Sequence, residues 1–249
     1  MFALSGVFKH ARREGFLDNE NPMRDVSVPG RPKKFKGPVY TMDDIENIAE
    51  AVAKKDMKAF AVISVAAFTG LRLAELRGLR WGDYDGMSLH VGRSVWRTVV
   101  NETKTESSEA SVPVLPLLQK VLYDHRARVK GEDEQYMFAG ERRGTSLNLA
   151  NLARRVILPA IADYSDEIQQ SIEWRGWHAF RRSLAINLLG CGVEPKIIQA
   201  ILRHSDISTT MNIYVQAPDA DARAALQKIE DLLGLNGGGL ELNQRSETP

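Results

Sequence analysis

The chain has 249 residues, a net charge of +1, 43% hydrophobic residues and 26% charged residues, which are ordinary values for a soluble globular protein. The balanced charge gives no overall indication of nucleic acid, and the single cysteine, Cys191, excludes an internal disulfide and predicts a reducing cytoplasm. The longest apolar run, residues 59–68, is too short to cross a bilayer, and the N-terminus has no signal-peptide pattern.

The first elements in chain order are predicted to be helices. A short helix covers residues 2–14, and a polar linker with proline and glycine follows over 18–38. Thr41 and Asp44 have the spacing of a capping box in front of an apolar helical repeat, which predicts a helix over 41–55. Further helices are predicted over 57–69 and from near Arg72 onward.

A small sheet is predicted next, after the turn residues of "WGDYDG". Strand-like alternation covers 88–92, 94–100 and 110–116, with the polar turn "NETKTESSE" between the last two strands. Helical periodicity then returns over 116–129, 146–162, 178–189, 195–202, 209–214 and 219–233, and "NGGG" begins a tail. We therefore predict a mainly α fold with a small antiparallel β-sheet (α+β).

Several cationic side chains and one tyrosine suit chemistry on a phosphodiester. His178 and Arg181 are three residues apart on a predicted helix, so they share a face. Guanidinium groups bind phosphate oxygens and stabilise the charge that develops in the transition state. A tyrosine hydroxyl needs a base or a positive field to become a nucleophile, and a lysine is a suitable proton donor for a leaving oxygen. The candidate set is Arg72, Lys104, His178, Arg181, His204 and Tyr214.

Each candidate has a structural alternative when it is considered alone. Arg72 could form a structural ion pair with Glu75, and Lys104 could be a solvated lysine in a turn. His178 could be a satisfied core histidine, and Tyr214 could be a packing residue. The joint occurrence of six candidates in order favours catalysis.

The stretches "TGLRLAELRGLRWGD", "TKTESSEASVPV", "HAFRRS" and "LRHSDISTTMNIY" resemble, in that order, the four catalytic motifs of the tyrosine recombinase (phage integrase) family. The resemblance covers residues 37–217, the catalytic domain of that family. It implies that Arg72, His178, Arg181 and His204 act on the scissile phosphate, with Glu75 supporting the site. It also implies that Lys104 protonates the leaving 5′ oxygen and that Tyr214 is the nucleophile.

The implied reaction forms a 3′-phosphotyrosyl link and a free 5′ hydroxyl, and it implies no ATP, metal or other cofactor. Three of the motifs depart from the usual family pattern without removing a catalytic group. Arg203 stands where the family usually has glycine, Ala179 and Phe180 stand inside the His-x-x-Arg box, and Ala110 stands where an arginine often follows the hairpin motif.

The resemblance also predicts a domain organisation. Residues 1–36 resemble the last helix and linker of a core-binding domain whose other helices are missing, 37–217 form the catalytic domain, and 218–249 form an amphipathic helix and a tail. Without the rest of the clamp we expect weak DNA affinity with a reduced salt dependence. The family's C-terminal helix commonly docks on a neighbouring subunit, which implies a homotetramer on two DNA duplexes, assembled from weakly associated monomers.

Residues that contact DNA outside the catalytic set are predicted on polar surfaces. Polar side chains of the predicted 146–162 helix could enter a major groove, and two further arginines are expected to be DNA-backbone or surface residues. These residues are Asn148, Asn151, Arg154, Arg155, Arg182 and Arg203. Asp83 and Asp85 are too few carboxylates for a metal site and are interpreted as turn residues.

Three functions remain open from the sequence. The first is a site-specific DNA recombinase or integrase. The second is a DNA-binding relic that no longer recombines, and the third is an enzyme with type IB topoisomerase-like relaxation of DNA. The order and spacing of the four motifs favour the first.

Overall fold

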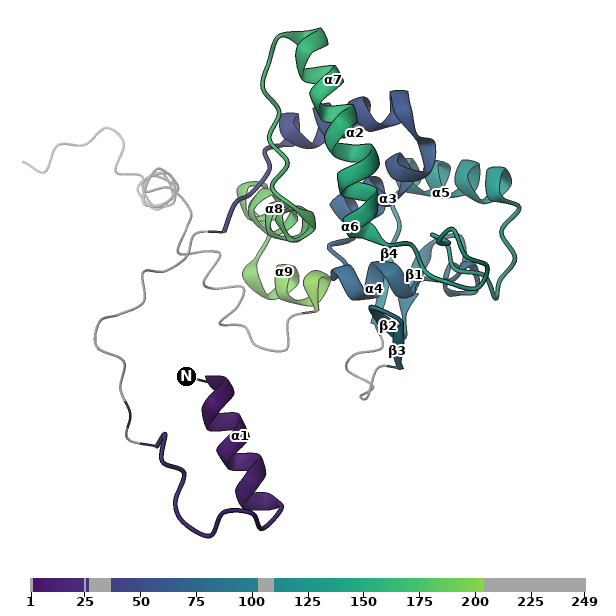
Figure 1. Cartoon of the computed structure of the whole chain (residues 1–249). Helices are drawn as coiled ribbons and strands as arrows, with labels where there is room; N and C mark the ends of the chain where they lie inside the picture. The colour runs from purple at the N-terminus through teal and green to yellow at the C-terminus, as the bar shows by residue number, and fades with distance from the viewer. Residues whose placement is uncertain (1, 25, 27–36, 103–109, 204–249) are drawn as a thin grey trace, which may run out of the picture. The chain divides into compact units, whose positions relative to one another are not determined.

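A computed structural model describes residues 2–24, 26, 37–102 and 110–203, and the chain divides into two compact units, Met1–Lys36 and Gly37–Pro249 (Figure 1). In the first unit, helix α1 (Phe2–Arg13) is followed by a loop. The side-chain amide of Asn21 donates to the backbone carbonyl of Ser5 at 3.2 Å and to its hydroxyl at 3.1 Å, which folds the loop back onto the helix.

Helices α2 (Met42–Lys55) and α3 (Met57–Thr69) confirm the predicted spans. The capping box is formed: the Thr41 N–H donates to Asp44 Oδ2 at 2.9 Å, and the Asp44 N–H donates to Thr41 Oγ1 at 3.1 Å. Asp56 caps α3 by accepting from two backbone N–H groups. Since most residues of α3 are buried, this helix lies at the centre of the core.

Four short strands form two antiparallel pairs in the part of the chain that the structure describes. Strand β1 (Ser88–Val91) pairs with β4 (Ala110–Pro113), and β2 (Arg93–Trp96) pairs with β3 (Val99–Glu102). The prediction of one strand over 94–100 is therefore wrong, because the chain turns at Arg97, whose φ is 54°. The apolar pattern runs on through this turn, and neither Arg97 nor Thr98 is a typical residue of a tight hairpin turn, so the sequence does not reveal it.

Helix α4 (Leu73–Gly78) begins directly after Arg72, as predicted, and is followed by the short 3₁₀ turn η1 (Trp81–Asp83). The prediction that Asp85 is a turn residue is confirmed, because its Oδ1 accepts from the N–H groups of Met87 and Ser88 at 2.8 and 2.7 Å. After β4, helix α5 (Pro116–Val129) matches the predicted span and starts with proline, whose missing N–H costs nothing in a first turn.

The helix predicted over 146–162 starts later and ends later in the structure. It consists of α6 (Leu149–Leu152), the π-helical segment η3 (Ala153–Ile157) and α7 (Leu158–Ile168). In the π segment the Leu158 N–H donates to the carbonyl of Ala153, five residues earlier. Pro159 follows and has no N–H for the carbonyl four residues before it, which explains the local widening.

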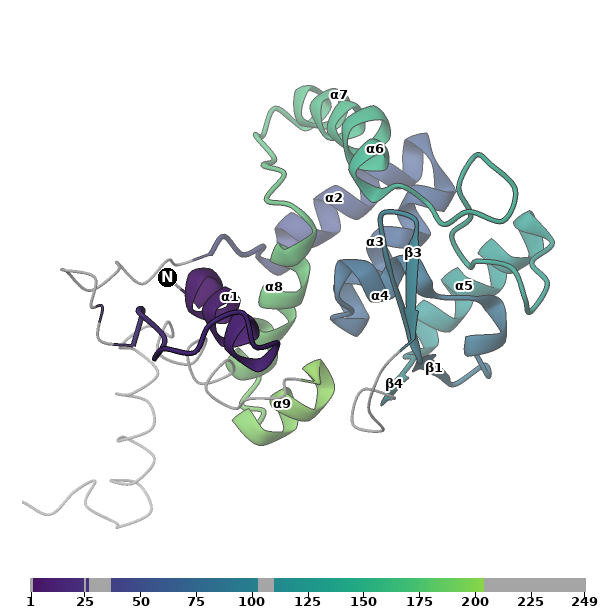
Figure 2. The same cartoon turned by 60° about the horizontal axis from the view of Figure 1, so that its bottom comes forward.

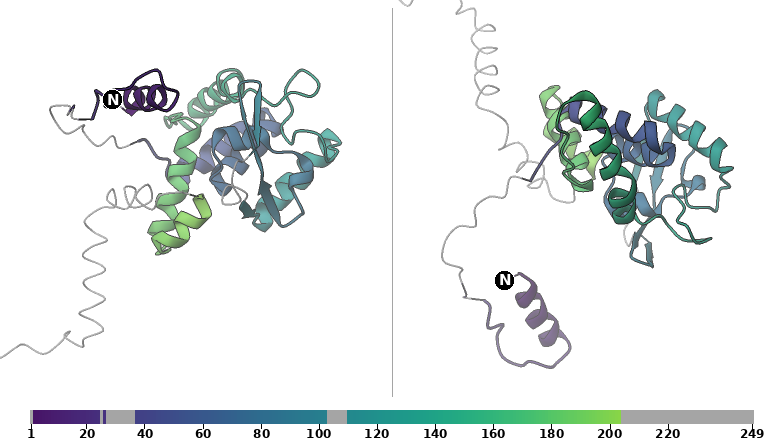
Figure 3. Two further views of the ribbon diagram at one scale, coloured as in Figure 1. Left: turned by 90° about the horizontal axis from the view of Figure 1, so that it is seen from below. Right: turned by 45° about the horizontal axis from the view of Figure 1, so that its top comes forward.

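Helices α8 (Trp177–Gly190) and α9 (Pro195–Leu202) confirm the last two predicted helices within the described ranges. Aromatic rings anchor α8: Trp174 packs against Tyr40, Trp177 and Phe180 with ring centroids 5.3–6.3 Å apart. In the second unit, α8 and α9 lie on one side of α4, and the strands and α5 lie on its other side (Figures 2 and 3). Helix α4 is therefore placed between the two halves of the unit.

The fold is mainly helical with a small antiparallel β component, as the sequence predicts. Its main core joins α2, α3, α5 and α7 with the strands, and a smaller cluster of Ala185, Ile198 and Leu202 attaches α9 to α8. No helix within the described ranges is long and apolar enough to cross a membrane.

Candidate active site

Arg72 and Glu75 form the base of the candidate site at the start of α4. The Arg72 N–H donates to Glu75 Oε2 at 2.8 Å, and Arg72 Nη1 donates to Glu75 Oε1 at 2.7 Å. The Arg72 side chain is 44% exposed and the Glu75 side chain 12% exposed. A carboxylate in the first turn of a helix is favoured by the helix dipole, so α4 fixes Glu75 and Glu75 fixes Arg72. The structural alternative for Arg72, an ion pair with Glu75, is thus present in the folded chain.

Arg181 joins three segments that are far apart in the sequence. Its side chain is buried on α8, Nη1 donates to the carbonyl of Gly70 at 2.5 Å, and Nη2 donates to the carbonyl of Leu202. Gly70 ends α3 with φ 60°, and a Cβ there would lie 2.6 Å from Leu202 Cδ2, so glycine allows the close approach of α9. The end of α3 and the end of α9 are held together by one guanidinium.

Arg203 completes the cluster, although the sequence predicts only a DNA-backbone or surface residue there. Its side chain is 7% exposed, which contradicts a surface position, and Nη2 donates to Glu75 Oε2 at 2.6 Å. Its carbonyl accepts from Arg72 Nη2 at 3.1 Å. The signal in the sequence is the arginine at the position where the family usually has glycine, and nothing in the helical pattern indicates that its side chain turns inward.

Burial and neighbouring charges shift the pKa values of the groups in this cluster. Burial acts to raise the pKa of the Glu75 carboxyl, but the charge of Arg203 and the hydrogen bonds from Arg72 outweigh it and hold that pKa below its ordinary value. Burial, together with the charge of Arg72, lowers the pKa of Arg181 to about 10. Burial also lowers the pKa of Arg203. Among the described residues, three guanidinium groups share the one carboxylate of Glu75, so the cluster retains an excess of positive charge.

The other predicted catalytic residues are distributed differently. His178 is exposed in the first turn of α8, three residues before Arg181, and the alternative of a core histidine is wrong. Lys104, His204 and Tyr214 lie outside the described residues. The structure therefore brings together Arg72, Glu75 and Arg181 of the predicted set and adds Arg203.

The predicted DNA-reading residues lie near the start of α6. Asn148 is the N-cap, and its Oδ1 accepts from the N–H groups of Ala150 and Asn151 at 3.1 Å each, so this acceptor is used within the helix. Asn151, Arg154 and Arg155 are exposed.

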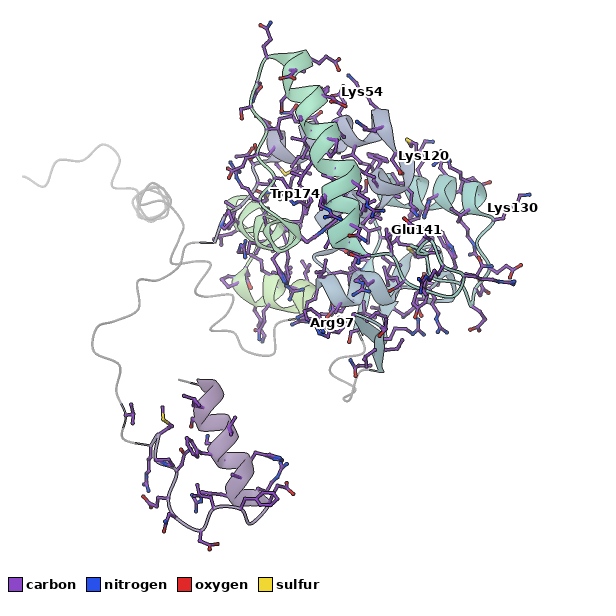
Figure 4. All side chains as sticks on the ribbon, viewed as in Figure 1. Lys54, Arg97, Lys120, Lys130, Glu141 and Trp174 are labelled. Carbon is purple, nitrogen blue, oxygen red and sulfur yellow. The ribbon has the colours of Figure 1, made fainter. Side chains whose placement is uncertain are left out.

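A cavity of about 530 Å³ lies beside this helix start, lined in part by Lys58, Arg142, Asn151 and Arg155. Glu141, labelled in Figure 4, also lines the cavity and lies 3.7 Å from Arg155. Three of the charged residues that line this cavity are basic, and two, Asp56 and Glu141, are acidic.

Arg182 is half-buried on α8, and its Nε donates to the carbonyl of Pro38 at 3.0 Å, so it also attaches the start of the unit to this helix. Asp83 is engaged with Arg80 and Arg93. In the parts of the chain that the structure describes, no group of three or more histidine, cysteine, aspartate or glutamate residues could hold a metal ion.

The model of the phage integrase family matches residues 38–221, which include the whole arginine cluster. The chain belongs to the phage integrase family. Every predicted catalytic residue of this integrase-family chain lies inside the matched range.

Relatives and solved structures agree with this membership. The "Tyrosine recombinase XerC-like" protein of Caldanaerobacter subterraneus subsp. tengcongensis is 28% identical over 262 residues, covering 92% of this chain and 64% of the relative. The tyrosine recombinase XerA of Pyrococcus furiosus is 25% identical over 237 residues, covering 95% of this chain and 74% of the relative. The chain thus spans less than two thirds of the length of the first of these relatives.

The fold is similar to that of the Tn1549 transposon integrase, whose structure was solved in complex with circular intermediate DNA. The TM-score is 0.68 at 21% identity, and the match covers 90% of this chain and 78% of that integrase. The crystal structure of XerA recombinase matches with a TM-score of 0.56 at 23% identity, covering 91% of this chain and 73% of that protein. At these identities the similarity shows the fold.

Proposed function

We propose that this chain is a site-specific DNA recombinase that cleaves and rejoins DNA strands through a 3′-phosphotyrosyl intermediate. The observation that carries the proposal is the cluster of Arg72, Arg181 and Arg203 around Glu75, because its excess positive charge suits one phosphodiester. The family membership and the names of the relatives, which are tyrosine recombinases, support it.

The proposed reaction follows from the chemistry of the predicted residues. Arg72 and Arg181 bind the non-bridging oxygens of the scissile phosphate and stabilise the charge of the pentacoordinate transition state. The Tyr214 oxygen forms a bond to phosphorus as the bond to the 5′ oxygen breaks, and Lys104 donates the proton that the 5′ oxygen takes up.

His178 and His204 are the bases of the predicted set that are suited to accept the tyrosine proton. A 5′ hydroxyl from another strand then reverses the step. Because the covalent link retains the bond energy, the proposed reaction uses neither ATP nor a metal ion.

The proposed partner is double-stranded DNA. The Tn1549 integrase, to which the fold is similar, was solved with DNA. Exposed polar groups at the start of α6 and in η3 are suited to a groove, and the basic side chains of Lys58 and Arg142 in the cavity beside them are suited to the backbone. Asn151, Arg154 and Arg155 are the proposed groove contacts, with Asn148 as the residue that caps their helix and Arg182 as a backbone contact.

We further propose three domains, a tetrameric assembly and a cytoplasmic location. The linker unit covers residues 1–36, the catalytic domain covers 37–217, and the C-terminal helix with its tail covers 218–249. The working assembly is a homotetramer on two DNA duplexes. The single cysteine fits a reducing cytoplasm.

The test is a search for a covalent adduct. The full chain is incubated with a pool of nicked duplexes of random sequence, so that a cleaved strand loses its short 5′-hydroxyl fragment and the protein stays attached. Adducts that survive denaturant are recovered and their DNA is sequenced. We expect adducts with the chain and none with Tyr214→Phe. DNA binding without any adduct would contradict the proposal and indicate a binding relic, and relaxation of plasmid without a site requirement would indicate a topoisomerase.

A further inference from the structure

Arg203 is the least expected member of the arginine cluster, because its charged side chain is more than nine-tenths buried. Nη2 donates to Glu75 Oε2 at 2.6 Å. Nη1 is buried and has no hydrogen-bond partner among the residues that the structure describes. Buried polar groups nearly always have a partner, so an unpartnered guanidinium nitrogen beside a phosphate-binding cluster calls for an explanation.

The backbone of Arg203 is also unusual. It ends α9 in the left-handed conformation with φ 54°, and its N–H donates to the carbonyls of Ala200 and Gln199. Glycine is the residue that normally occupies this cap without strain, and an arginine there carries a conformational cost. The left-handed backbone at this position does not require an arginine side chain. The role of Arg203 therefore lies in the contacts that this side chain makes.

Arg203 constrains Arg72 in two ways. Its side chain binds Glu75 Oε2, which leaves Oε1 as the oxygen for Arg72 Nη1, and its carbonyl binds Arg72 Nη2. Without the Arg203 side chain, Glu75 Oε2 keeps only its contact with the Arg72 N–H, so the guanidinium of Arg72 can exchange the Arg203 carbonyl for the second oxygen of Glu75 and form the bidentate arrangement that arginine and carboxylate prefer. Arg72 would then be directed to Glu75 rather than to a ligand.

We infer that Arg203 is a positioning residue of the strand-transfer site, which holds Glu75, directs Arg72 toward the scissile phosphate and adds positive charge to the cluster. This inference rests on the proposed function. The Arg203 carbonyl that accepts from Arg72 belongs to the backbone, and glycine readily adopts the same left-handed conformation. Arg203→Gly therefore removes the guanidinium and keeps the carbonyl.

The rate of adduct formation separates positioning from binding. With a DNA duplex recovered in the adduct search, we expect Arg203→Gly to react about tenfold more slowly than the unchanged chain at saturating DNA, because a displaced Arg72 stabilises the transition state less well. The DNA concentration that gives half the maximal rate changes less than about twofold, since the phosphate contacts elsewhere are unchanged. Arg203→Lys, which keeps the charge, recovers part of the rate.

Lys130→Gly is the matched control for the backbone change. Lys130 also ends a helix, α5, in the left-handed conformation with φ 52°, and its side chain is exposed at the end of that helix (Figure 4). Lys130→Gly relieves the same kind of strain without touching the cluster, so its reaction rate stays within about twofold of that of the unchanged chain. An Arg203→Gly chain that reacts as fast as the Lys130→Gly chain would overturn the inference.

A second measurement tests the contact with Glu75 without using the reaction. Because Arg203 helps to hold the pKa of the Glu75 carboxyl low, its loss raises that pKa, and stability is lost at a higher pH during acid titration. We expect this shift in Arg203→Gly and not in Lys130→Gly, measured by thermal unfolding between neutral and acid pH. Identical acid profiles for both variants would overturn the inference. An unchanged chain that forms no adduct dependent on Tyr214 would instead contradict the proposed function.

Discussion

Two arginine sites in the second unit share one local design and differ in charge balance. In each, an arginine before a short helix donates its N–H to a carboxylate three residues later: Arg72 to Glu75 at 2.8 Å, and Arg80 to Asp83 at 2.7 Å. Each carboxylate also accepts from a distant arginine at 2.6 Å, which is Arg203 for Glu75 and Arg93 for Asp83.

The charges around the two carboxylates are different. Asp83 neutralises Arg93, and the Arg80 guanidinium lies 3.4 Å from Glu134, so this site has as many carboxylates as arginines. Glu75 is the one carboxylate that acts on Arg72, Arg181 and Arg203 among the described residues. The balanced site is fully accounted for by ion pairs within the fold, whereas the excess positive charge among the described residues around Glu75 suits a bound anion.

The largest difference is expected in catalysis. Arg181→Lys keeps a positive charge but loses the planar guanidinium that is proposed to bind the phosphate oxygens. We expect the rate of adduct formation at saturating DNA to fall about 10²- to 10³-fold. The matched change in the balanced site, Arg93→Lys, changes that rate less than about twofold. Single-turnover kinetics on one duplex measure both variants, and equal losses in the two would remove the distinction between the sites.

The next difference is in stability. Glu75→Gln leaves buried guanidinium groups without their carboxylate, and we expect a loss of about 3 kcal/mol in the free energy of unfolding. Asp83→Asn, in a site whose charges are balanced and more exposed, costs about 1 kcal/mol. Urea titrations of the two variants measure both values. A smaller loss for Glu75→Gln than for Asp83→Asn would contradict the account of the excess charge.

Two glycines sharpen the comparison of how closely each site is packed. Gly70, whose carbonyl accepts from Arg181, has φ 60° and no room for a Cβ, whereas Gly86, near the balanced site, has φ 95° and open space around it. We expect Gly70→Ala to lower the free energy of unfolding by about 2 kcal/mol and Gly86→Ala by about 1 kcal/mol. Thermal unfolding of the two variants checks the order, and equal losses would mean that α9 does not approach α3 closely.

The smallest effect concerns a buried group away from the Glu75 cluster. Burial lowers the pKa of His125 below its ordinary value of 6.5, and its Nε2 lies 3.0 Å from the Met137 carbonyl. The unfolded chain therefore takes up this proton at a higher pH than the folded chain, and stability decreases as the pH falls below about 6.5 toward the folded-state pKa. His125→Phe should flatten this part of the stability profile, measured by urea titration at several pH values. An unchanged slope would show that another group is responsible.

The sequence predicts the elements whose signals are local. Thr41 with Asp44 marks a helix start by capping chemistry, and helical periodicity gives the spans 57–69 and 116–129; all three predicted spans are confirmed. The hairpin at Arg97 and the π segment Ala153–Ile157 are not evident in the sequence, since each changes the backbone inside a segment whose periodic pattern continues. Pairing of β1 with β4 depends on contacts across the chain that no local pattern specifies.

The candidate site is only partly readable from sequence for the same reason. Spacing brings Arg72 to Glu75 and places His178 on the helix of Arg181. The inward turn of Arg203 depends on a left-handed cap and on the packing of α9 against α3, which are tertiary features. Its burial could therefore be seen only in the folded chain.

The most direct test of the central claim, that the arginine cluster serves a phosphate attacked by Tyr214, is the identity of the covalent bond. An adduct formed with DNA is trimmed with nuclease and protease, and tandem mass spectrometry locates the nucleotide on the remaining peptide. The account predicts a 3′-phosphate linked to Tyr214, with a free 5′ hydroxyl on the released strand. A nucleotide attached to another residue, or a 5′-phosphate linkage, would contradict it.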